Sequence, residues 1–370
     1  MSQALSEYFS LSQRYARSIN LERDIDEPES IAGYVLTDRA LSALKRILVD
    51  APESNRTHAW TITGVYGTGK SAFAQFLSCL CAPQNSLVKS HALEVAKKAL
   101  GGDNQDYRSL ETNLTPRGWF RGIAAAQREP LAHTIVRALD KGAQTYWRKA
   151  RTKPEVVKKL VDLNVEINAG YQIGSKEVLR VFEEVTRAVK SHILLIIDEL
   201  GKSLEFASLH QSNEDLYLLQ QLAELKQPQG QQFYLLGLLH QSFADYGYRL
   251  ASIQRNEWAK IQGRFTDIYF TESPRQMTRL IGQAIDKSHV GKYGLTVQKR
   301  AKEWYSTLSS EVDDISLELF AATYPLHPIT ALVLPILCTR YAQNDRSLFT
   351  FLGSLEPFSF QNYLIDYSQR

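Results

Sequence analysis

Short apolar runs alternate with longer amphipathic stretches over the first three quarters of this chain of 370 residues. The short runs are rich in β-branched, aromatic and aliphatic residues, which predicts buried strands; they cover residues 59–63, 119–126, 192–197, 233–239 and 267–270. Apolar residues at helical spacing predict helices at 38–49, 70–81, 87–100, 130–149, 175–190 and 213–226. Strands that alternate with helices indicate a parallel sheet covered on both faces.

From Pro274 onward the pattern becomes helical throughout, with helices expected at 274–288, 296–309, 314–323 and 328–342. The fold class expected is therefore α/β, with a parallel-sheet core and a C-terminal helical lid domain. We expect an N-terminal arm at 1–30, the core at 31–272 with a helical insertion at about 84–175, and the lid at 273–370. Within the insertion, residues 148–175 read as basic and then irregular.

Composition narrows the class of protein only slightly. Hydrophobic residues make up 44% of the chain, enough for a substantial core, and the formal charge of +3 neither requires nor excludes nucleic acid. Three cysteines suit a reducing compartment rather than a disulfide framework. We see no signal peptide and no apolar stretch of membrane-spanning length, so we expect a cytoplasmic protein without a membrane partner.

A phosphate-binding loop follows the first predicted strand. Residues Gly64–Ser71 (GVYGTGKS) fit the pattern G-x-x-x-x-G-K-[ST] in full, with a helix expected after it. The glycines let the backbone turn tightly and point N–H groups inward, and the helix start adds positive charge. We expect Lys70 to reach the β- and γ-phosphates and Ser71 to bind Mg²⁺. The residues expected to contact nucleotide are Gly64, Tyr66, Gly67, Thr68, Gly69, Lys70, Ser71 and Ala72.

An acidic pair ends the most apolar run of the chain. Five aliphatic residues, 193–197, lead into Asp198 and Glu199, and such a run suits a central parallel strand buried on both faces. Asp198 is expected to hold Mg²⁺ through water, as the Walker-B aspartate does, and Glu199 to polarise the attacking water. Together with the loop, the pair predicts a P-loop NTPase core that hydrolyses a nucleoside triphosphate. No guanine-reading Asn-Lys-x-Asp motif is present, which favours ATP.

These motifs resemble the AAA+ and STAND group of P-loop ATPases, close to origin-recognition-type proteins. Three further phrases are similar to ATPases of bacterial anti-phage defence loci: residues 17–24 (RSINLERD), 198–202 (DELGK) and 343–349 (QNDRSLF). The resemblance covers about residues 25–355. The stretch between Ser71 and Asp198 is longer than in a minimal AAA+ module, which is where we place the insertion.

The resemblance implies roles for five more residues. His240 or Gln241, at the end of the strand 233–239, would contact the γ-phosphate or the lytic water; the alternative is a polar residue that merely leaves a strand. Arg264 would be an arginine finger, acting in its own subunit or in a neighbour, or else a surface ion pair. Pro325 would pack near the adenine, or else start a helix, and Arg346 would contact phosphate from the lid.

Three hypotheses for function follow. The first is a Mg²⁺-dependent ATPase that drives conformational change in an anti-phage defence complex acting on DNA. The second is a STAND-type, nucleotide-gated oligomerisation switch with slow hydrolysis. The third is a DNA-loading or remodelling ATPase. All three imply ATP and Mg²⁺ as cofactors and a homo-oligomer; other defence-system subunits and double-stranded DNA are the further partners to expect.

Overall fold

The computed structural model describes residues 4–12, 19–31, 33–51, 58–65, 67–210, 212–225, 230–247, 252–311, 315–341 and 348–366. The chain divides into two compact units. One, the sheet unit, comprises residues 19–65 and 69–270, and the other, the helical unit, comprises residues 1–18, 66–68 and 271–370. The arm expected at residues 1–30 is thus divided between the two units.

The sheet unit is built on five parallel strands in the order β3-β4-β5-β2-β6. The strands are β2 (Ala59–Thr63), β3 (Phe120–Ala125), β4 (Ile193–Asp198), β5 (Phe233–Leu239) and β6 (Thr266–Tyr269). All five coincide with predicted strands to within one residue. One strand, β5, separates the strand before the phosphate loop from the strand that ends in the acidic pair. This sheet, with helices on both faces and a helical C-terminal region, is the predicted P-loop NTPase fold.

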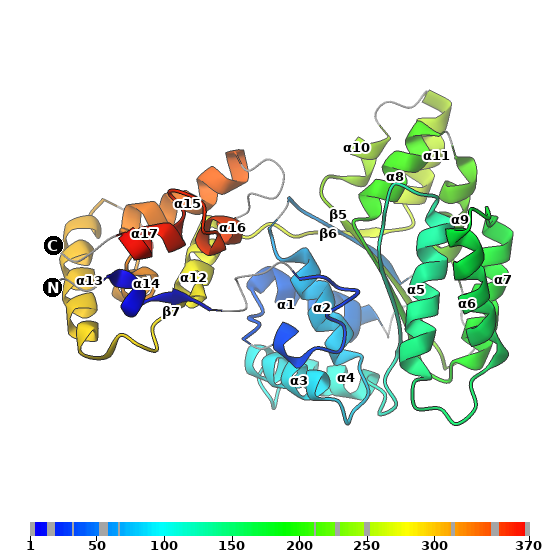
Figure 1. Cartoon of the computed structure of the whole chain (residues 1–370), viewed down its shortest axis with the longest axis horizontal. Helices are drawn as coiled ribbons and strands as arrows, with labels where there is room; N and C mark the ends of the chain where they lie inside the picture. The colour runs from blue at the N-terminus through cyan, green and yellow to red at the C-terminus, as the bar shows by residue number, and fades with distance from the viewer. Residues whose placement is uncertain are drawn as a thin grey trace. The chain divides into compact units, whose positions relative to one another are not determined.

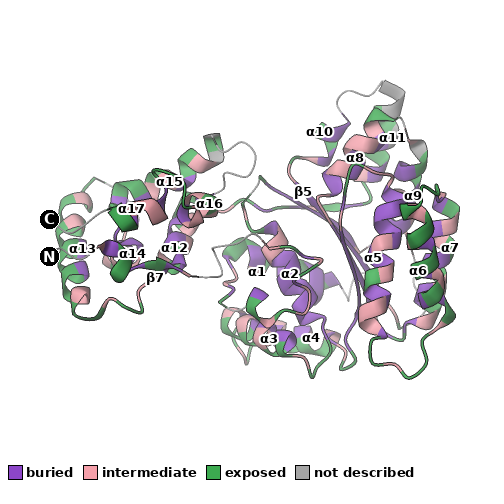
Figure 2. Ribbon diagram, viewed as in Figure 1, coloured by how far each residue is buried: buried purple, intermediate pink, exposed green. Residues whose placement is uncertain are grey.

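Helices cover both faces of this sheet (Figure 1), and its central strands are buried (Figure 2). Along β4, Ile193, Leu195 and Ile197 face the core shared with α5 (Leu131–Tyr146), α7 (Ser175–Ala188) and α9 (Asn213–Ala223). Leu194 and Ile196 face the opposite core, which contains α2 (Lys70–Leu80), α3 (Leu87–Leu100) and α4 (Gln105–Asn113). An uninterrupted aliphatic run therefore serves two cores at once.

The remaining helices of the sheet unit include some that the sequence pattern did not reveal. They are α1 (Asp38–Leu44), which continues as a wider helical turn over Lys45–Asp50, α6 (Glu155–Asn168), α8 (Leu200–Leu209), α10 (Phe243–Tyr246) and α11 (Ser252–Gln262). The interpretation of residues 148–175 as irregular was wrong over α6. Val156, Val157, Leu160 and Leu163 lie on one buried face of that helix, while charged residues such as Lys158 and Asp162 are exposed.

The helical unit contains α12 (Pro274–Ala284), α13 (Gly294–Leu308), α14 (Leu317–Thr323), α15 (Pro328–Tyr341), α16 (Leu348–Gly353) and α17 (Phe360–Asp366). The helix expected at 274–288 ends early, because residues 285–286 form β7 (Ile285–Asp286), which pairs with β1 (Ser10–Leu11). Leu5, Phe9 and Leu11 are buried in the core of this unit. The N-terminal segment is therefore part of the helical unit rather than a free arm.

Among the described residues, no single helix is long and apolar enough to cross a membrane. Helices α14 and α15 meet the length and composition criteria only when joined, and the pair is bent by 73°.

Candidate nucleotide site

Three parallel strands bring the predicted site residues to one edge of the sheet. Thr63, the last residue of β2, is level with Leu239, the last of β5. The Gly64 N–H donates to the Leu239 carbonyl (3.1 Å), and the Ala126 N–H donates to the Asp198 carbonyl (2.8 Å). The phosphate loop, the acidic pair and His240 therefore emerge from the same carboxyl edge, where parallel α/β sheets bind ligands.

The phosphate loop has the backbone that its glycines predict. Gly67 and Gly69 have φ of 77° and 87°, in the left-handed region that favours glycine. Gly69 is the N-cap of α2, and Lys70 and Ser71 are the first residues of the helix, with Ala72 behind them in the first turn. The first N–H groups and the positive end of this 11-residue helix are therefore presented at the loop.

Lys70 is folded back into the loop that it is expected to serve. Its Nζ donates to the carbonyls of Gly64 (2.5 Å) and Val65 (2.9 Å), and only 5% of the residue is exposed. Burial lowers the pKa of this ammonium to about 8, against the attraction of Asp198 and Glu199. A triphosphate would supply the negative charge that a buried ammonium requires.

Ser71 and Asp198 meet although 127 residues separate them. The Ser71 hydroxyl donates to Asp198 Oδ2 (3.1 Å), and the Glu199 N–H donates to Asp198 Oδ1 (2.9 Å). Burial raises the pKa of Asp198, while these two hydrogen bonds oppose the shift. Two oxygen donors converge at this point, which is the donor type that Mg²⁺ prefers.

Glu199 occupies a strained position at the start of α8. Its φ is 51°, a left-handed conformation that costs a non-glycine residue about 1–2 kcal/mol. Its carboxylate forms an ion pair with Lys202, one helical turn further on. The next residue, Leu200, packs where β5 has Gly237, at which a Cβ would lie 2.4 Å from the Leu200 side chain. Because Gly237 has no side chain, Leu200 packs closely against β5, and this contact fixes the position of the start of α8.

His240 and Gln241 lie at the same edge but differ in burial. His240 is partly buried, and burial lowers its pKa to about 4, with the charge of Lys70 acting in the same direction. The imidazole is therefore neutral at pH 7. Gln241 is exposed. The charges that act on His240 include those of Lys70 and Glu199, so this imidazole lies near both.

Arg264 lies away from the phosphate loop of its own subunit. It precedes β6, whose first residue Thr266 is level with Trp60, near the start of β2. Three residues of strand, about 10 Å, therefore separate Thr266 from the level of Thr63 at the carboxyl edge. The guanidinium of Arg264 forms an ion pair with Glu224, after the end of α9. The sheet unit does not bring Arg264 and Lys70 together.

The other predicted contacts are distributed differently. Thr68, within the loop, is partly exposed. Pro325 belongs to the helical unit, where it is buried between α14 and α15. Tyr66 and Arg346 lie outside the described residues.

Two residues near the acidic pair were missed by the sequence analysis. The sequence signal for Lys202 was its i, i+3 spacing from Glu199 at a helix start. The role of Gly237 depends on contact with Leu200, a helix start 37 positions earlier in the chain, which no local pattern reveals.

No protein-family model and no curated protein sequence matches the chain. Similar solved structures include the ORC2 protein of Aeropyrum pernix in ADPNP–ADP complexes, with 14% identity, a TM-score of 0.38, and coverage of 82% of this chain and 71% of that one. The ADP form of that ORC2 protein has 14% identity and a TM-score of 0.37, with coverage of 87% of this chain and 79% of that one. The Aeropyrum pernix ORC1 protein in complex with DNA has 14% identity and a TM-score of 0.37, with coverage of 92% of this chain and 66% of that one. At such TM-scores the fold assignment rests on the sheet order and the loop, not on these likenesses.

Proposed function

We propose that this protein binds and hydrolyses ATP with Mg²⁺ at the carboxyl edge of its sheet. The observation that carries the proposal is the 3.1 Å hydrogen bond between Ser71 and Asp198 beside the buried ammonium of Lys70. The two halves of a phosphate site come from β2 and β4, and they meet where the fold places ligands.

Each residue has a role that its surroundings support. The loop N–H groups and the start of α2 would bind the β-phosphate, and Lys70 would exchange its carbonyl partners for phosphate oxygens. Glu199, beside the acidic strand end, would orient and deprotonate the attacking water. His240, neutral at working pH, would donate a hydrogen bond to the γ-phosphate or to that water without adding charge.

Ser71 and Asp198 fit a divalent cation, since both present oxygen and the Asp198 carboxylate is buried next to the loop. Mg²⁺ held there would neutralise the phosphate charge that develops in the transition state. Asp198 would hold the ion directly or through water, and Ser71 would hold it through its hydroxyl.

We further propose that Arg264 acts on the site of a neighbouring subunit. It lies towards the opposite edge of the sheet from its own phosphate loop, so it cannot serve as a finger within the sheet unit. Its partner Glu224 would release it when a neighbour offers a more negative phosphate. A homo-oligomer is then needed for full activity.

The test is ATP turnover by purified protein over a protein concentration series, with Lys70→Ala as the blank and the exposed Lys98→Ala as the matched control. We expect turnover that rises more than linearly with protein, none in Lys70→Ala, and normal turnover in Lys98→Ala. Equal turnover in Lys70→Ala and wild type would refute the assigned site.

A second pair of variants tests the general base. Glu199→Gln is expected to bind ATP normally and to lose about 10²–10⁴-fold in turnover, because the amide cannot accept the proton of water. Glu205→Gln, in the same helix and partly exposed, is the matched control and should be unaffected. Full turnover in Glu199→Gln would remove this residue from the mechanism.

A nucleotide-gated switch is the second candidate, and the ion pair between Glu199 and Lys202 favours it. With the carboxylate paired, hydrolysis is slow, and ATP binding alone would change the state of the protein. The variant Lys202→Met distinguishes the hydrolysing ATPase from the nucleotide-gated switch. Under the switch, freeing Glu199 raises turnover severalfold and shortens the ATP-bound state; unchanged turnover would mean that the ion pair exerts no restraint.

The role in an anti-phage defence complex, with other subunits and double-stranded DNA as partners, is proposed from the resemblance of the phrases at 17–24, 198–202 and 343–349. DNA affinity measured over a salt series with and without ATP tests the DNA part. Binding that weakens with salt and tightens with ATP supports a DNA-acting ATPase. Protection of cells from phage by the wild-type locus, lost in Lys70→Ala, tests the defence part.

A further inference from the structure

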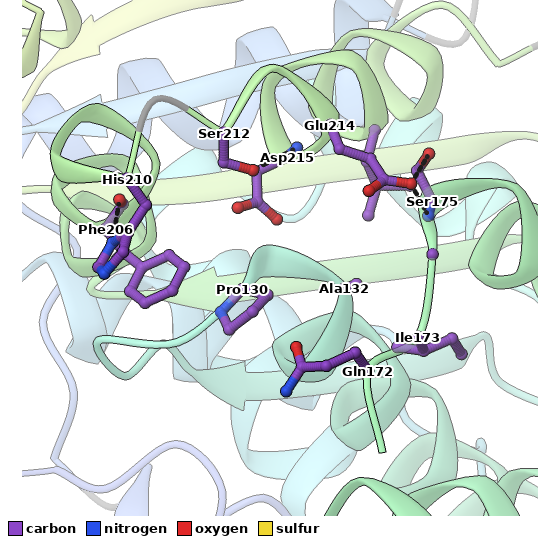
Figure 3. Close-up of a pocket in the computed structure, with 12 residues that line it drawn as sticks. Pro130, Ala132, Gln172, Ile173, Ser175, Phe206, His210, Ser212, Glu214 and Asp215 are labelled. Carbon is purple, nitrogen blue, oxygen red and sulfur yellow. Dashed lines mark hydrogen bonds between the residues drawn. The ribbon is translucent and has the colours of Figure 1, made fainter. Parts of the chain in front are cut away.

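A cavity of about 310 Å³ lies in the sheet unit away from the phosphate loop, where the ends of four helices meet. The first turns of α5, α7 and α9 and the C-terminal end of α8 surround it, as Figure 3 shows. None of its twelve lining residues, all within the described part of the chain, is a lysine or an arginine. Two of them are carboxylates, Glu214 and Asp215.

Both carboxylates cap neighbouring helices with one oxygen. Asp215 Oδ1 accepts from the Leu131 N–H at the start of α5 (2.8 Å), and Glu214 Oε1 accepts from the Ser175 N–H at the start of α7 (3.0 Å). The N-caps of those helices, Pro130 and Gly174, supply no side-chain cap of their own. This structural role explains one oxygen of each residue.

The second oxygen of Asp215 is not explained by capping. Only 5% of Asp215 is exposed, and in the described structure its Oδ2 has no hydrogen-bond partner. Burial raises the pKa of this carboxyl group, while the nearby Ser212 hydroxyl and the N–H groups of Leu131 and Ala132 oppose the shift. Figure 3 shows the carboxylate pointing into the cavity. A buried carboxylate oxygen without a partner is costly unless a donor reaches it.

Among the described residues that line the cavity, no lysine or arginine supplies a positive charge to that oxygen. Burial lowers the pKa of His133, two residues along α5 from Leu131, which disfavours the protonated imidazole. On the far side of the cavity, the Phe206 ring stacks on His210 with 4.0 Å between centroids. An aromatic face and a buried carboxylate together form a site suited to an organic cation.

We propose that this cavity binds an alkylguanidinium or alkylammonium group, which donates to Asp215 Oδ2 and to the outer oxygen of Glu214 and lies against Phe206. A free amine and the basic side chain of a peptide share this chemistry. The inference goes beyond the proposed ATPase activity and does not depend on it, because the binding test contains no nucleotide.

The test is isothermal titration of the full chain with agmatine, with butylamine, and with N-butylurea as the neutral analogue. Asp215→Asn keeps the carbonyl oxygen that caps α5 but removes the charge. Glu183→Gln, at an exposed ion pair with Arg187 on α7, is the matched control. We expect saturable binding of the cations, no binding of N-butylurea, and at least a tenfold loss of affinity in Asp215→Asn alone.

A short acetylated peptide with one central arginine distinguishes the two sources. If the peptide displaces agmatine and binds more tightly than agmatine does, the cavity is assigned to a basic side chain of a partner. If agmatine binds more tightly than the peptide, the cavity is assigned to a small molecule. A circular dichroism melt of each variant verifies that it is folded. Equal agmatine affinity in folded Asp215→Asn and wild type, or no saturable binding of either cation to wild type, would overturn the proposal.

Discussion

Replacing Lys70 by methionine should stabilise the nucleotide-free protein while abolishing its activity. Methionine has similar length and no charge to desolvate. The shift of the Lys70 pKa from 10.5 to about 8 corresponds to about 3 kcal/mol of destabilisation at pH 7, at about 1.4 kcal/mol per unit. Loss of the hydrogen bonds to Gly64 and Val65 offsets part of the gain, but that loss is the same at every pH.

The pH dependence isolates the contribution of the ammonium. Because the folded pKa is the lower one, the unfolded chain binds more protons between about pH 8 and 10.5, so wild-type stability rises relative to Lys70→Met over this window. The penalty falls from about 3 kcal/mol at pH 7 to about 1 kcal/mol at pH 10. The difference in unfolding free energy between variant and wild type should therefore shrink by about 2 kcal/mol.

The assay is urea denaturation followed by tryptophan fluorescence at pH 7 and pH 10. Four of the five tryptophans lie in the sheet unit, and Trp304→Phe in every protein removes the signal of the helical unit. Lys98→Met, at an exposed lysine, is the control and should show no such change with pH. A gap between Lys70→Met and wild type that is the same at both pH values would refute the account of Lys70 as a desolvated ammonium.

Four further predictions follow from other parts of the molecule. Arg264→Ala should lower turnover by about 10³-fold or more, and mixing it with Lys70→Ala should restore part of the activity, since a mixed oligomer pairs an intact finger with an intact loop; mixtures without activity would contradict a site shared between subunits. Turnover between pH 5 and 8 should show no protonation step attributable to His240, because its pKa is lowered to about 4, and a step near pH 6.5 that His240→Asn abolishes would contradict this. Phe9→Ala should destabilise the helical unit by about 3–5 kcal/mol, measured by Trp304 fluorescence, and leave the sheet unit unchanged. Agmatine should alter ATP turnover, since α8 runs from Glu199 to the cavity; binding without any effect on turnover would show that the two sites are independent.

The sequence by itself determined the strands of the sheet unit and the principal residues of the site. Strand positions were predictable because four of the five strands are short, almost wholly buried and mainly apolar runs, and residues 193–197 serve both cores. The phosphate loop was predictable because its backbone needs glycine at fixed positions and its chemistry needs lysine and serine directly after them. These requirements are local, so a single sequence reveals them.

Tertiary structure alone decided which distant residues meet. Helix α6 escaped detection because it follows a basic run at 148–153 and its four buried apolar residues alternate with charged ones. The N-terminal segment packs with the helical unit because β1 pairs with β7, where Ser10 lies opposite Asp286, 276 positions further along the chain. Parallel pairing of β6 with β2 fixed the distance of Arg264 from its own loop, and the packing of α5, α7 and α9 left an Asp215 oxygen without a partner. Long-range pairing and packing have no local sequence signature, because they depend on how separate elements fit together.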